Sequence, residues 1–555
     1  MQETDVLIIG AGPVGLTLAI DLGQRGVRCM IIEAKDKPRH LPKMERCNAR
    51  SMEIYRRLGL AERIREASFP LDARMDVCVM TRMSEPPLVR LEYPSVADSK
   101  AMIAACRDGS LPLEPYQVVS QYTLEPLLKS VAETISCVTV RFSCGLLSFE
   151  QDDTGVTSIA ETEGGGRETI RAKYMVGCDG GRSTVRKQLG IALEGEGRIV
   201  RRNQVFFRCD DFFAKCPSEQ ARMYFFANKD KTVITVQDDL KHFSATTDCW
   251  GDEKELKAVL QEVIGYPVDL TVLAATPWNL NLLVAERYMD RRVLMAGDSV
   301  HLVIPSGGLG LNTGIGDATD LAWKLAAVLQ GWGGPTLLAS YEVERLPVGR
   351  RNRDASRYAT QGQQAWRTAI RSFIGENTPE GRGTRGALVR LASVEQRKTH
   401  EMVGTELGYC YSGSDIIIHE DTEAPPDIRE YYVPSARPGY RLPHMWLSDG
   451  SAVQDKTGKG FTLLRFRPES NSGDELLRAF QAIGAPIEIL DLADPALRAI
   501  YGADLILLRP DLHVAFRGDH DPENAAAVAA IVTGHGKPSL PTGLNAAPAN
   551  NVSVR

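Results

Sequence analysis

Three glycines and one acid near the N-terminus have the types and the spacing that hold a dinucleotide. Gly10, Gly12 and Gly15 form the pattern G-x-G-x-x-G between an apolar run and a helical pattern, and Glu33 ends the next apolar run. The first glycine permits a tight turn, the second lets the backbone approach a pyrophosphate, and the third packs helix on strand. The helix N-terminus adds partial positive charge, and Glu33 can accept from a ribose hydroxyl. The residues predicted to bind this cofactor are Gly10, Gly12, Pro13, Val14, Gly15, Glu33 and Ala34.

The spacing of the three N-terminal glycines does not distinguish an NAD site from an FAD site. Two later pairs of an acid and a glycine also suit cofactor binding. Asp179-Gly180 follows an apolar run, and Gly297-Asp298 follows another. The second pair leads into a glycine-rich loop that ends at Asn312, where a helical pattern begins. Asp179 has a second interpretation, because an acid here can also cap the helix that starts near residue 183.

The elements that must position these residues follow from hydrophobic periodicity. Residues 5–10 and 27–33 are apolar runs on either side of a helical pattern, which predicts a βαβ unit with a parallel sheet. Residues 136–176 and 204–248 alternate apolar and polar positions, which predicts antiparallel strands. A parallel sheet therefore carries the glycine motif, and a separate, mostly antiparallel layer is expected at residues 204–248.

Helical spacing appears in two further regions. Residues 46–66 show it, and residues 340–405 are predicted as helices with one loop at 376–386. Five prolines between 425 and 443 mark a linker into a C-terminal unit of alternating strands and helices.

Composition bounds the class of protein. The chain has 555 residues, a formal charge of −6 and average apolar content, so several folded units and no general attraction to nucleic acid or anionic membrane are expected. Its eleven cysteines include no C-x-x-C pair and no zinc-site spacing. We therefore predict a cytoplasmic protein without a disulfide scaffold or a metal site.

The three cofactor stretches, in this order and with these flanks, resemble the GxGxxG, DG and GD fingerprints of the class A single-component FAD-dependent aromatic hydroxylases, which include the phenol monooxygenases. Residues 48–53 (NARSME), Ser120-Gln121 with 124–126 (LEP), and Asp317-Ala318 with 321–325 (LAWKL) are similar to further motifs of that family. The resemblance covers residues 4–358. Beyond the linker, residues 434–439 and 508–511 resemble the thioredoxin-like C-terminal domain of its phenol- and polyketide-hydroxylating members. That domain has no cysteine after Cys410, so a packing role is expected for it.

The resemblance implies specific cofactor contacts. Asp298 would bond the ribityl chain of FAD, and the loop to Asn312 would present backbone N–H groups to the isoalloxazine. Gln121 would meet the ribityl or adenosine side, and Pro305 would offer its carbonyl near the reactive flavin edge. Lys43 stands where the family usually has an arginine, so it keeps a point charge but loses the bidentate fork. The further residues predicted to bind FAD are Lys43, Gln121, Asp179, Gly180, Asp298, Gly308, Gly310, Leu311 and Asn312.

Four residues are candidates for the substrate side, with Pro305 as the fifth catalytic candidate. Arg222 and Tyr224 alternate on a predicted strand of the layer that covers the substrate in the family. Glu45 and Arg46 precede the helix that approaches the flavin and suit a phenol or a substrate carboxylate. Each has a structural alternative: Tyr224 as a core residue with a satisfied hydroxyl, and the charged residues as solvated groups.

The predicted fold class is α/β, with a Rossmann-like FAD-binding domain, an inserted and mostly antiparallel β substrate domain, and a C-terminal thioredoxin-like α/β domain. The predicted ranges are 1–75, 106–200 and 286–360 for the FAD-binding domain, 76–105 and 201–285 for the substrate domain, 361–425 for a helical segment and linker, 426–540 for the C-terminal domain, and 541–555 for a tail.

The function implied is hydroxylation of a phenolic compound with O2 and NADH or NADPH through a flavin C4a-hydroperoxide. Because no second Rossmann fingerprint follows a strand, the nicotinamide would bind only transiently. A heteroaromatic or polycyclic polyketide substrate is the alternative, and an NAD-dependent dehydrogenase or a non-catalytic flavoprotein is the second. The C-terminal domain suggests a homodimer by analogy.

Overall fold

A mainly parallel sheet carries the glycine motif. The computed structural model describes residues 1–38, 41–43, 45–217, 220–470 and 472–536. The sheet has the order β16-β17-β10-β1-β2-β7, and β1 pairs in parallel with both β10 and β2. This confirms the predicted βαβ unit. The bounds are β1 Gln2–Ile9, β2 Cys29–Ile32, β7 Val138–Arg141, β8 Cys144–Gln151, β9 Val156–Thr162, β10 Arg167–Gly177, β16 Met289–Asp290 and β17 Val293–Met295.

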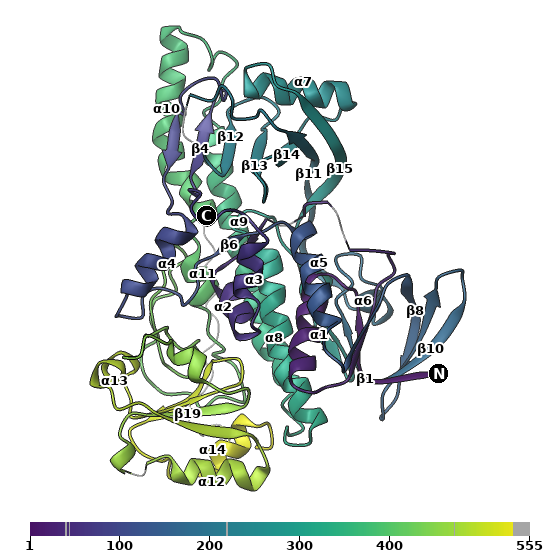
Figure 1. Ribbon diagram of the computed structural model, residues 1–555, viewed down its shortest axis with the longest axis vertical. Coiled ribbons are helices and arrows are strands. Elements are labelled where there is room, and N and C mark those ends of the chain that lie inside the picture. The colour runs from purple at the N-terminus through teal and green to yellow at the C-terminus, as the bar shows by residue number, and fades with distance from the viewer. Residues whose placement is uncertain (39–40, 44, 218–219, 471, 537–555) are drawn as a thin grey trace, which may run out of the picture.

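Three helices bury their apolar sides beside this sheet. They are α1 Pro13–Gln24, α5 Gln121–Ala132 and α8 Leu309–Leu329, and Figure 1 shows α5, α1 and α8 next to one another. One apolar cluster joins β1 and β2 to α1 and α8, with Leu16 and Leu321 wholly buried. Burial on both sides explains why β1 and β2 read as continuous apolar runs.

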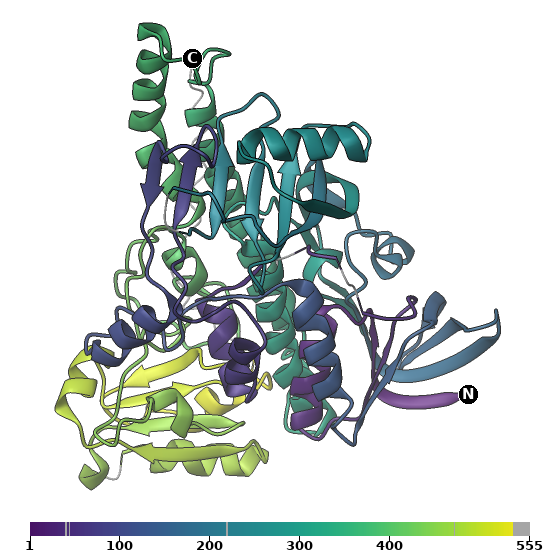
Figure 2. The ribbon, with the colours of Figure 1, turned by 45° about the horizontal axis from the view of Figure 1, so that its top comes forward.

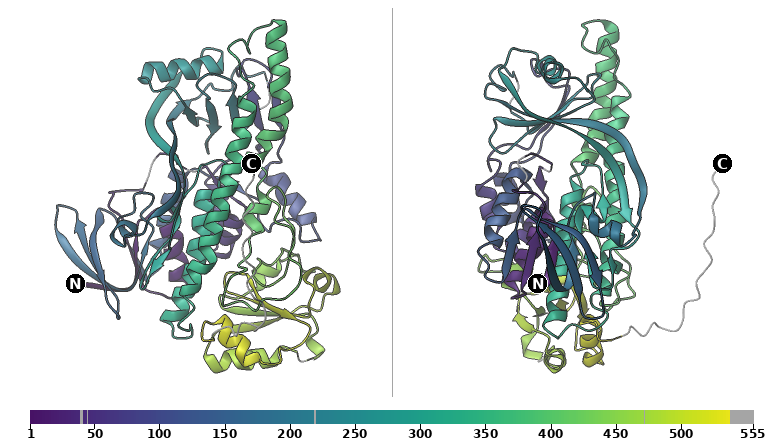
Figure 3. Two further views of the ribbon diagram at one scale, coloured as in Figure 1. Left: turned by 180° about the vertical axis from the view of Figure 1, so that it is seen from behind. Right: turned by 90° about the vertical axis from the view of Figure 1, so that its right-hand side faces the viewer.

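The second sheet is mostly antiparallel, as predicted, and stands above the first in Figure 1. Its order is β18-β15-β11-β14-β13-β12-β4-β5, in which β12 and β4 are a parallel pair. The strands β11 and β15 are long and curve across the molecule in Figure 3. The bounds are β4 Val77–Met80, β5 Val89–Leu91, β11 Leu193–Cys209, β12 Met223–Phe226, β13 Val233–Val236, β14 His242–Thr247, β15 Leu270–Ala285 and β18 His301–Leu302, with α7 Glu253–Ile264 packed on this sheet.

Two predictions about helices were wrong in detail. The helical region at 46–66 is two helices, α2 Ala49–Arg57 and α3 Ala61–Glu66, separated at Gly59, whose φ is +75°. The predicted loop at 376–386 is mostly helix: α9 spans Ala339–Arg367 and α10 spans Pro379–Glu395. Thr378 caps α10 by accepting from the Gly381 N–H at 3.1 Å, so a glycine-rich stretch begins a helix there.

The C-terminal unit is a four-stranded sheet of order β20-β19-β21-β22 with helices against it, seen at the lower left of Figure 2. The bounds are β19 Phe461–Arg465, β20 Ile487–Asp491, β21 Leu505–Leu508, β22 Val514–Gly518, α12 Asp474–Ile483, α13 Pro495–Tyr501 and α14 Ala525–Val532. The remaining helices of more than four residues are α4 Val96–Ala105, α6 Thr184–Gln188 and α11 Val403–Leu407.

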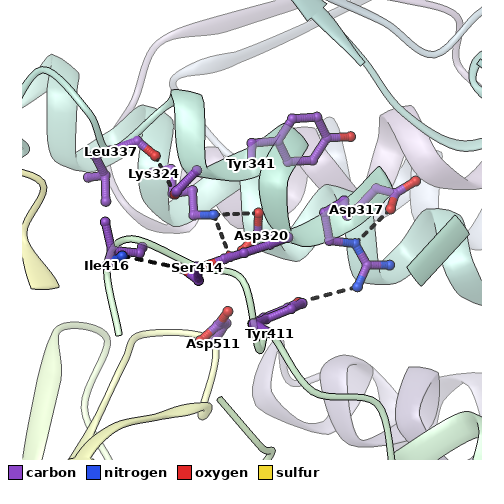
Figure 4. A network of polar contacts seen from close by, with 12 residues as sticks. Asp317, Asp320, Lys324, Leu337, Tyr341, Tyr411, Ser414, Ile416 and Asp511 are labelled. Carbon is purple, nitrogen blue, oxygen red and sulfur yellow. Dashed lines mark hydrogen bonds and ion pairs between the residues drawn. The ribbon is translucent and has the colours of Figure 1, made fainter. Parts of the chain in front are cut away.

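A buried network of charges joins this unit to α8 and α9. Lys324 on α8 donates to Asp320 at 2.8 Å and to Glu344 of α9 at 2.6 Å (Figure 4). Arg509, which follows β21, donates to Glu344 at 2.5 Å and to Asp320 at 3.0 Å. The side chains of these four residues have no exposed surface. This buried network is the contact through which the C-terminal unit packs against α8 and α9, which fits the packing role expected for that unit.

The ranges proposed for the domains stay predictions. The tail at 541–555 lies outside the described residues. Among the described helices, none combines the length and the apolar character that crossing a membrane requires.

Candidate active site

The three motif glycines have different surroundings. Gly10 has a φ of +104°, and a Cβ there would lie 2.5 Å from the carbonyl oxygen of Cys178. A Cβ on Gly15 would lie 2.1 Å from the carbonyl oxygen of Gly10, so both glycines are required by chain packing. A Cβ on Gly12 would have no described atom within 4 Å. Gly12 is the N-cap of α1, and no side-chain hydrogen bond caps this helix end within the described chain. The first N–H groups of α1 are therefore open to a phosphate group.

Glu33 reaches back to the glycine loop. Its carboxylate accepts from the backbone N–H of Ala11 at 3.1 Å and from that of Lys35 at 3.1 Å. Ala34, beside it, is exposed. These bonds fix the Glu33 carboxylate next to the motif, where its role toward a ribose stays a prediction.

Asp298 and Lys43 form an ion pair. The Lys43 Nζ lies 2.5 Å from Asp298 Oδ2. Gly297, with a φ of +66°, would place a Cβ 3.0 Å from Val14 Cγ2, so this turn packs against the start of α1. The structure thus brings two predicted cofactor residues together from positions 255 residues apart.

Asn312 locks the glycine-rich loop to the segment before α2. Its Oδ1 accepts from the Asn48 N–H at 2.9 Å, and its Nδ2 donates to the carbonyls of Arg46 at 3.2 Å and Gly308 at 2.5 Å. Gly307 and Gly308 have φ values of +87° and +66°, and Gly308 is the N-cap of α8. The backbone N–H groups at this helix end are held in a fixed arrangement. Leu311 and Gly310 lie half-buried in the first turn of α8.

The Pro305 carbonyl accepts a hydrogen bond inside the same loop. The Gly308 N–H donates to it at 2.8 Å, and the Pro305 ring is exposed. One acceptor site of this carbonyl is therefore used by the loop itself, and its role near a flavin edge stays a prediction.

Asp179 caps a helix and retains a free oxygen. Its Oδ2 accepts from the N–H groups of Thr184 at 2.7 Å and Val185 at 3.2 Å, at the start of α6. Its Oδ1 is buried and has no hydrogen-bond partner in the described chain. Gly180 has a φ of +78° and would place a Cβ in open space. The capping interpretation accounts for one oxygen, and the other is available to a ligand.

Gln121 is buried at the start of α5 and donates to the carboxylate of Glu125. The same helix end is tied to the antiparallel sheet by Asp238. Asp238 accepts from the Ser120 N–H at 2.9 Å and from the Thr123 hydroxyl at 2.6 Å. Burial raises the pKa of the Asp238 carboxyl. Sequence reasoning missed Asp238, because nothing local marks it as a partner of α5.

Arg222 and Glu45 meet between the two sheets. Arg222 is 5% exposed, and its Nη2 lies 3.5 Å from Glu45 Oε2. The Ser244 hydroxyl on β14 donates to the other Glu45 oxygen at 2.9 Å. The Arg222 Nε is buried without a hydrogen-bond partner among the described residues, and burial lowers the pKa of this guanidinium. A buried, incompletely paired guanidinium is a site for an anionic group.

Arg46 links the glycine loop to a buried acid. Its Nη2 donates to the Gly307 carbonyl at 2.7 Å and lies 3.4 Å from Glu406 Oε1 on α11. Its guanidinium stands 5.5 Å from the centre of the Tyr116 ring. Burial raises the pKa of Glu406, and the charge of Arg46 opposes that shift. Burial also lowers the pKa of His400 well below its usual range, helped by Arg46 and Arg222.

The sequence carried no signal for Glu406, Tyr116 or His400, which lie outside every motif. They join Arg46 only because α11 and the residues before β6 (Gln117–Val118) fold against β3 (Arg46–Cys47).

Tyr224 lies in the core of the antiparallel sheet. Its hydroxyl accepts from the Ala221 N–H at 2.7 Å, and its ring centre is 6.1 Å from that of Phe212. Burial raises the pKa of this phenol. These contacts are those of a core residue with a satisfied hydroxyl, which was the structural alternative for Tyr224. A catalytic role for Tyr224 stays a prediction without a supporting contact.

Comparisons with known proteins agree with this geometry. The family model described as "FAD binding domain" matches residues 3–356, and the model described as "Aromatic-ring hydroxylase, C-terminal" matches residues 435–538. A protein of Streptomyces halstedii named as a polyketide hydroxylase is 32% identical over 81% of this chain and 78% of its own. The 2,4-dichlorophenol 6-monooxygenase of Cupriavidus pinatubonensis is 29% identical over 94% of each chain.

A solved structure shares the whole fold. The rebeccamycin biosynthetic enzyme RebC with reduced flavin superposes with a TM-score of 0.86 at 32% identity, covering 96% of this chain and 99% of that one. These findings confirm the predicted fold class and FAD as the cofactor.

Proposed function

Because this chain belongs to the FAD-dependent aromatic-ring hydroxylases, we propose that it hydroxylates a phenolic ring, using O2 and either NADH or NADPH. Membership of this family supports the coarser assignment, which is an FAD-dependent monooxygenase that acts on aromatic or polyketide substrates. The observation that carries the finer proposal is the buried Arg222, whose Nε has no partner among the described residues and which lies beside Glu45.

Several groups of this chain fit FAD. The open end of α1 at Gly12 suits the pyrophosphate, and Glu33 suits the ribose. Asp179 Oδ1 offers a buried acceptor, and the start of α8 at Gly308 offers backbone N–H groups with partial positive charge. When bound, FAD supplies the redox chemistry that activates O2 for transfer to an aromatic ring.

The side chains between the sheets would prepare the phenol. A positive guanidinium next to a phenol favours its ionised form, and ionisation makes the ring a better nucleophile. We assign this contact to Arg222, with Glu45 Oε2 as the nearest carboxylate to receive the phenolic proton. Arg46 positions the loop at Gly307, and the apolar core around β12 and β14 keeps water from the ring.

A phenol within a polycyclic polyketide is the second candidate. The relative from Streptomyces halstedii is named as a polyketide hydroxylase, and the 2,4-dichlorophenol relative is named for a single-ring substrate. The two candidates share the phenolic group that Arg222 would bind and differ in the size of the attached ring system.

A substrate panel tests the proposal. FAD-loaded protein is mixed with NADH or NADPH under anaerobic and aerobic conditions while single-ring phenols, aromatic acids and polycyclic phenols are added one at a time. We expect at least one phenol to accelerate flavin reduction and to yield a product one oxygen atom heavier. Acceleration only by aromatics that lack a phenolic hydroxyl would contradict the phenolic assignment while leaving the monooxygenase assignment intact.

Replacing Arg222 with methionine should lower kcat/KM for the active phenol about 30-fold, since losing a hydrogen bond to a charged group costs about 2 kcal/mol. The FAD content should stay unchanged, and the rate should recover at higher pH, where the phenol ionises without help. Arg208→Met is the matched control, because Arg208 is an exposed arginine of the same sheet that pairs with Asp210. An unchanged kcat/KM and pH profile in Arg222→Met would rule out this role.

The homodimer suggested by analogy also stays a prediction. Light scattering of the FAD-loaded protein measures it directly.

A further inference from the structure

A small cavity lies where α2 meets the C-terminal unit, away from the loops that surround the proposed flavin site. Its volume, counted as the space open to the centre of a water molecule, is about 20 Å³. Four arginines and two acids are among its lining residues: Arg50, Glu53, Arg56, Arg57, Arg441 and Asp455. The charged groups in its wall therefore carry an excess of positive charge.

Two of the four arginines have carboxylate partners of their own. Arg441 donates to both Glu53 oxygens, with its Nε at 2.6 Å, and Glu53 also accepts from the Leu113 N–H at 2.8 Å. Arg56 forms a two-point pair with Asp455 at 2.8 and 2.7 Å. The carboxylates in the wall are therefore engaged by Arg441 and Arg56.

Arg50 shares the Glu53 carboxylate with Arg441, and Arg57 has no hydrogen-bonded carboxylate among the described residues. Arg50 is 6% exposed; its Nη1 is 3.4 Å from Glu53, its Nη2 donates to the Asp511 carbonyl at 3.0 Å, and its Nε is buried without a partner among the described residues. Arg57 donates to the Thr457 hydroxyl at 2.9 Å and to the Gly458 carbonyl, both neutral groups. Burial lowers the pKa of Arg57 to about 10, the charges of Arg25 and Arg50 add to that shift, and the more distant carboxylates of Asp21 and Asp511 oppose it.

We propose that this cavity binds a small inorganic anion, of the class that includes chloride and phosphate, between Arg50 and Arg57. A buried charge is stable only when it is paired, and an anion here would supply the charge that the wall lacks. Arg57 belongs to α2, and its neutral partners Thr457 and Gly458 belong to the C-terminal unit. The anion would therefore strengthen the attachment of that unit to the helix that begins beside Asn312.

Thermal unfolding at constant ionic strength tests this site. FAD-loaded protein is measured in sodium gluconate, whose anion is too large for the cavity, and then with increasing chloride or increasing phosphate. We expect the midpoint to rise by on the order of 3 °C at 100 times the dissociation constant in the chloride or the phosphate series. The series that responds identifies the anion as a halide or an oxyanion. An equal midpoint in gluconate, chloride and phosphate would overturn the proposal.

Two further measurements keep the test independent of any one variant. Arg57→Gln should abolish the anion-specific rise, and Arg63→Gln, which changes an exposed arginine of α3, should preserve it. Equilibrium dialysis of the unmodified protein with radiolabelled chloride or phosphate should find one bound anion per chain. Saturable binding of neither anion would overturn the proposal even where a variant fails to fold.

Discussion

Replacing Arg509 with methionine is expected to destabilise the protein by about 3–5 kcal/mol, because it removes one partner of a buried charge network. Arg509 has no exposed surface and donates to Glu344, Asp320 and Asp511. Without it, Asp320 and Glu344 would keep only the charge of Lys324 among their described partners, and Asp511 would lose its guanidinium partner. Burial raises the pKa of Asp320 even with Arg509 present, and removing the positive charge of Arg509 would raise it further.

Urea unfolding of the FAD-loaded protein measures this effect. Arg517→Met is the matched control, because Arg517 lies in the same unit and forms a two-point pair with Glu420 that is about one-fifth exposed. We expect that control to lose about 1 kcal/mol or less. Equal losses for the two variants would show that the buried network does not anchor the C-terminal unit.

Replacing Gly12 with alanine is expected to weaken FAD binding about 100-fold, or about 2.8 kcal/mol, while the protein without cofactor keeps its stability. The physical reason is that a Cβ at Gly12 has no described atom within 4 Å, so the methyl group would meet only the cofactor. The φ of Gly12 is −74°, which alanine adopts without strain.

Gly15→Ala gives the contrast. Its Cβ would lie 2.1 Å from the carbonyl oxygen of Gly10, so this variant should unfold at a lower temperature with or without FAD. Fluorescence titration of FAD and thermal unfolding of the cofactor-free proteins separate the two effects. Wild-type FAD affinity in Gly12→Ala would mean that the pyrophosphate does not pass this backbone.

The sequence by itself determined the parts of the protein whose signal is local. The βαβ unit follows from two apolar runs and a glycine turn, and each appears within a few residues of its predicted bounds. The three fingerprints were enough to predict the family, the fold class and FAD, because each one is a short stretch whose backbone shape depends on its own residue types. Asp179 shows the same principle, since its capping role was expected from its distance to α6.

Only the tertiary structure decided which distant side chains meet. Arg46 and Glu406 are 360 residues apart, and no periodicity or motif links them. Asp238 was missed for the same reason, and the helical region at 46–66 was divided by Gly59, whose left-handed backbone overrides the apolar spacing around it. Tyr224 has the alternation of an active-site strand, yet the packing of Phe212 and the Ala221 N–H determines its surroundings. Hydrophobic periodicity specifies which face of an element is buried, whereas the partner on that face depends on how the sheets and helices pack together.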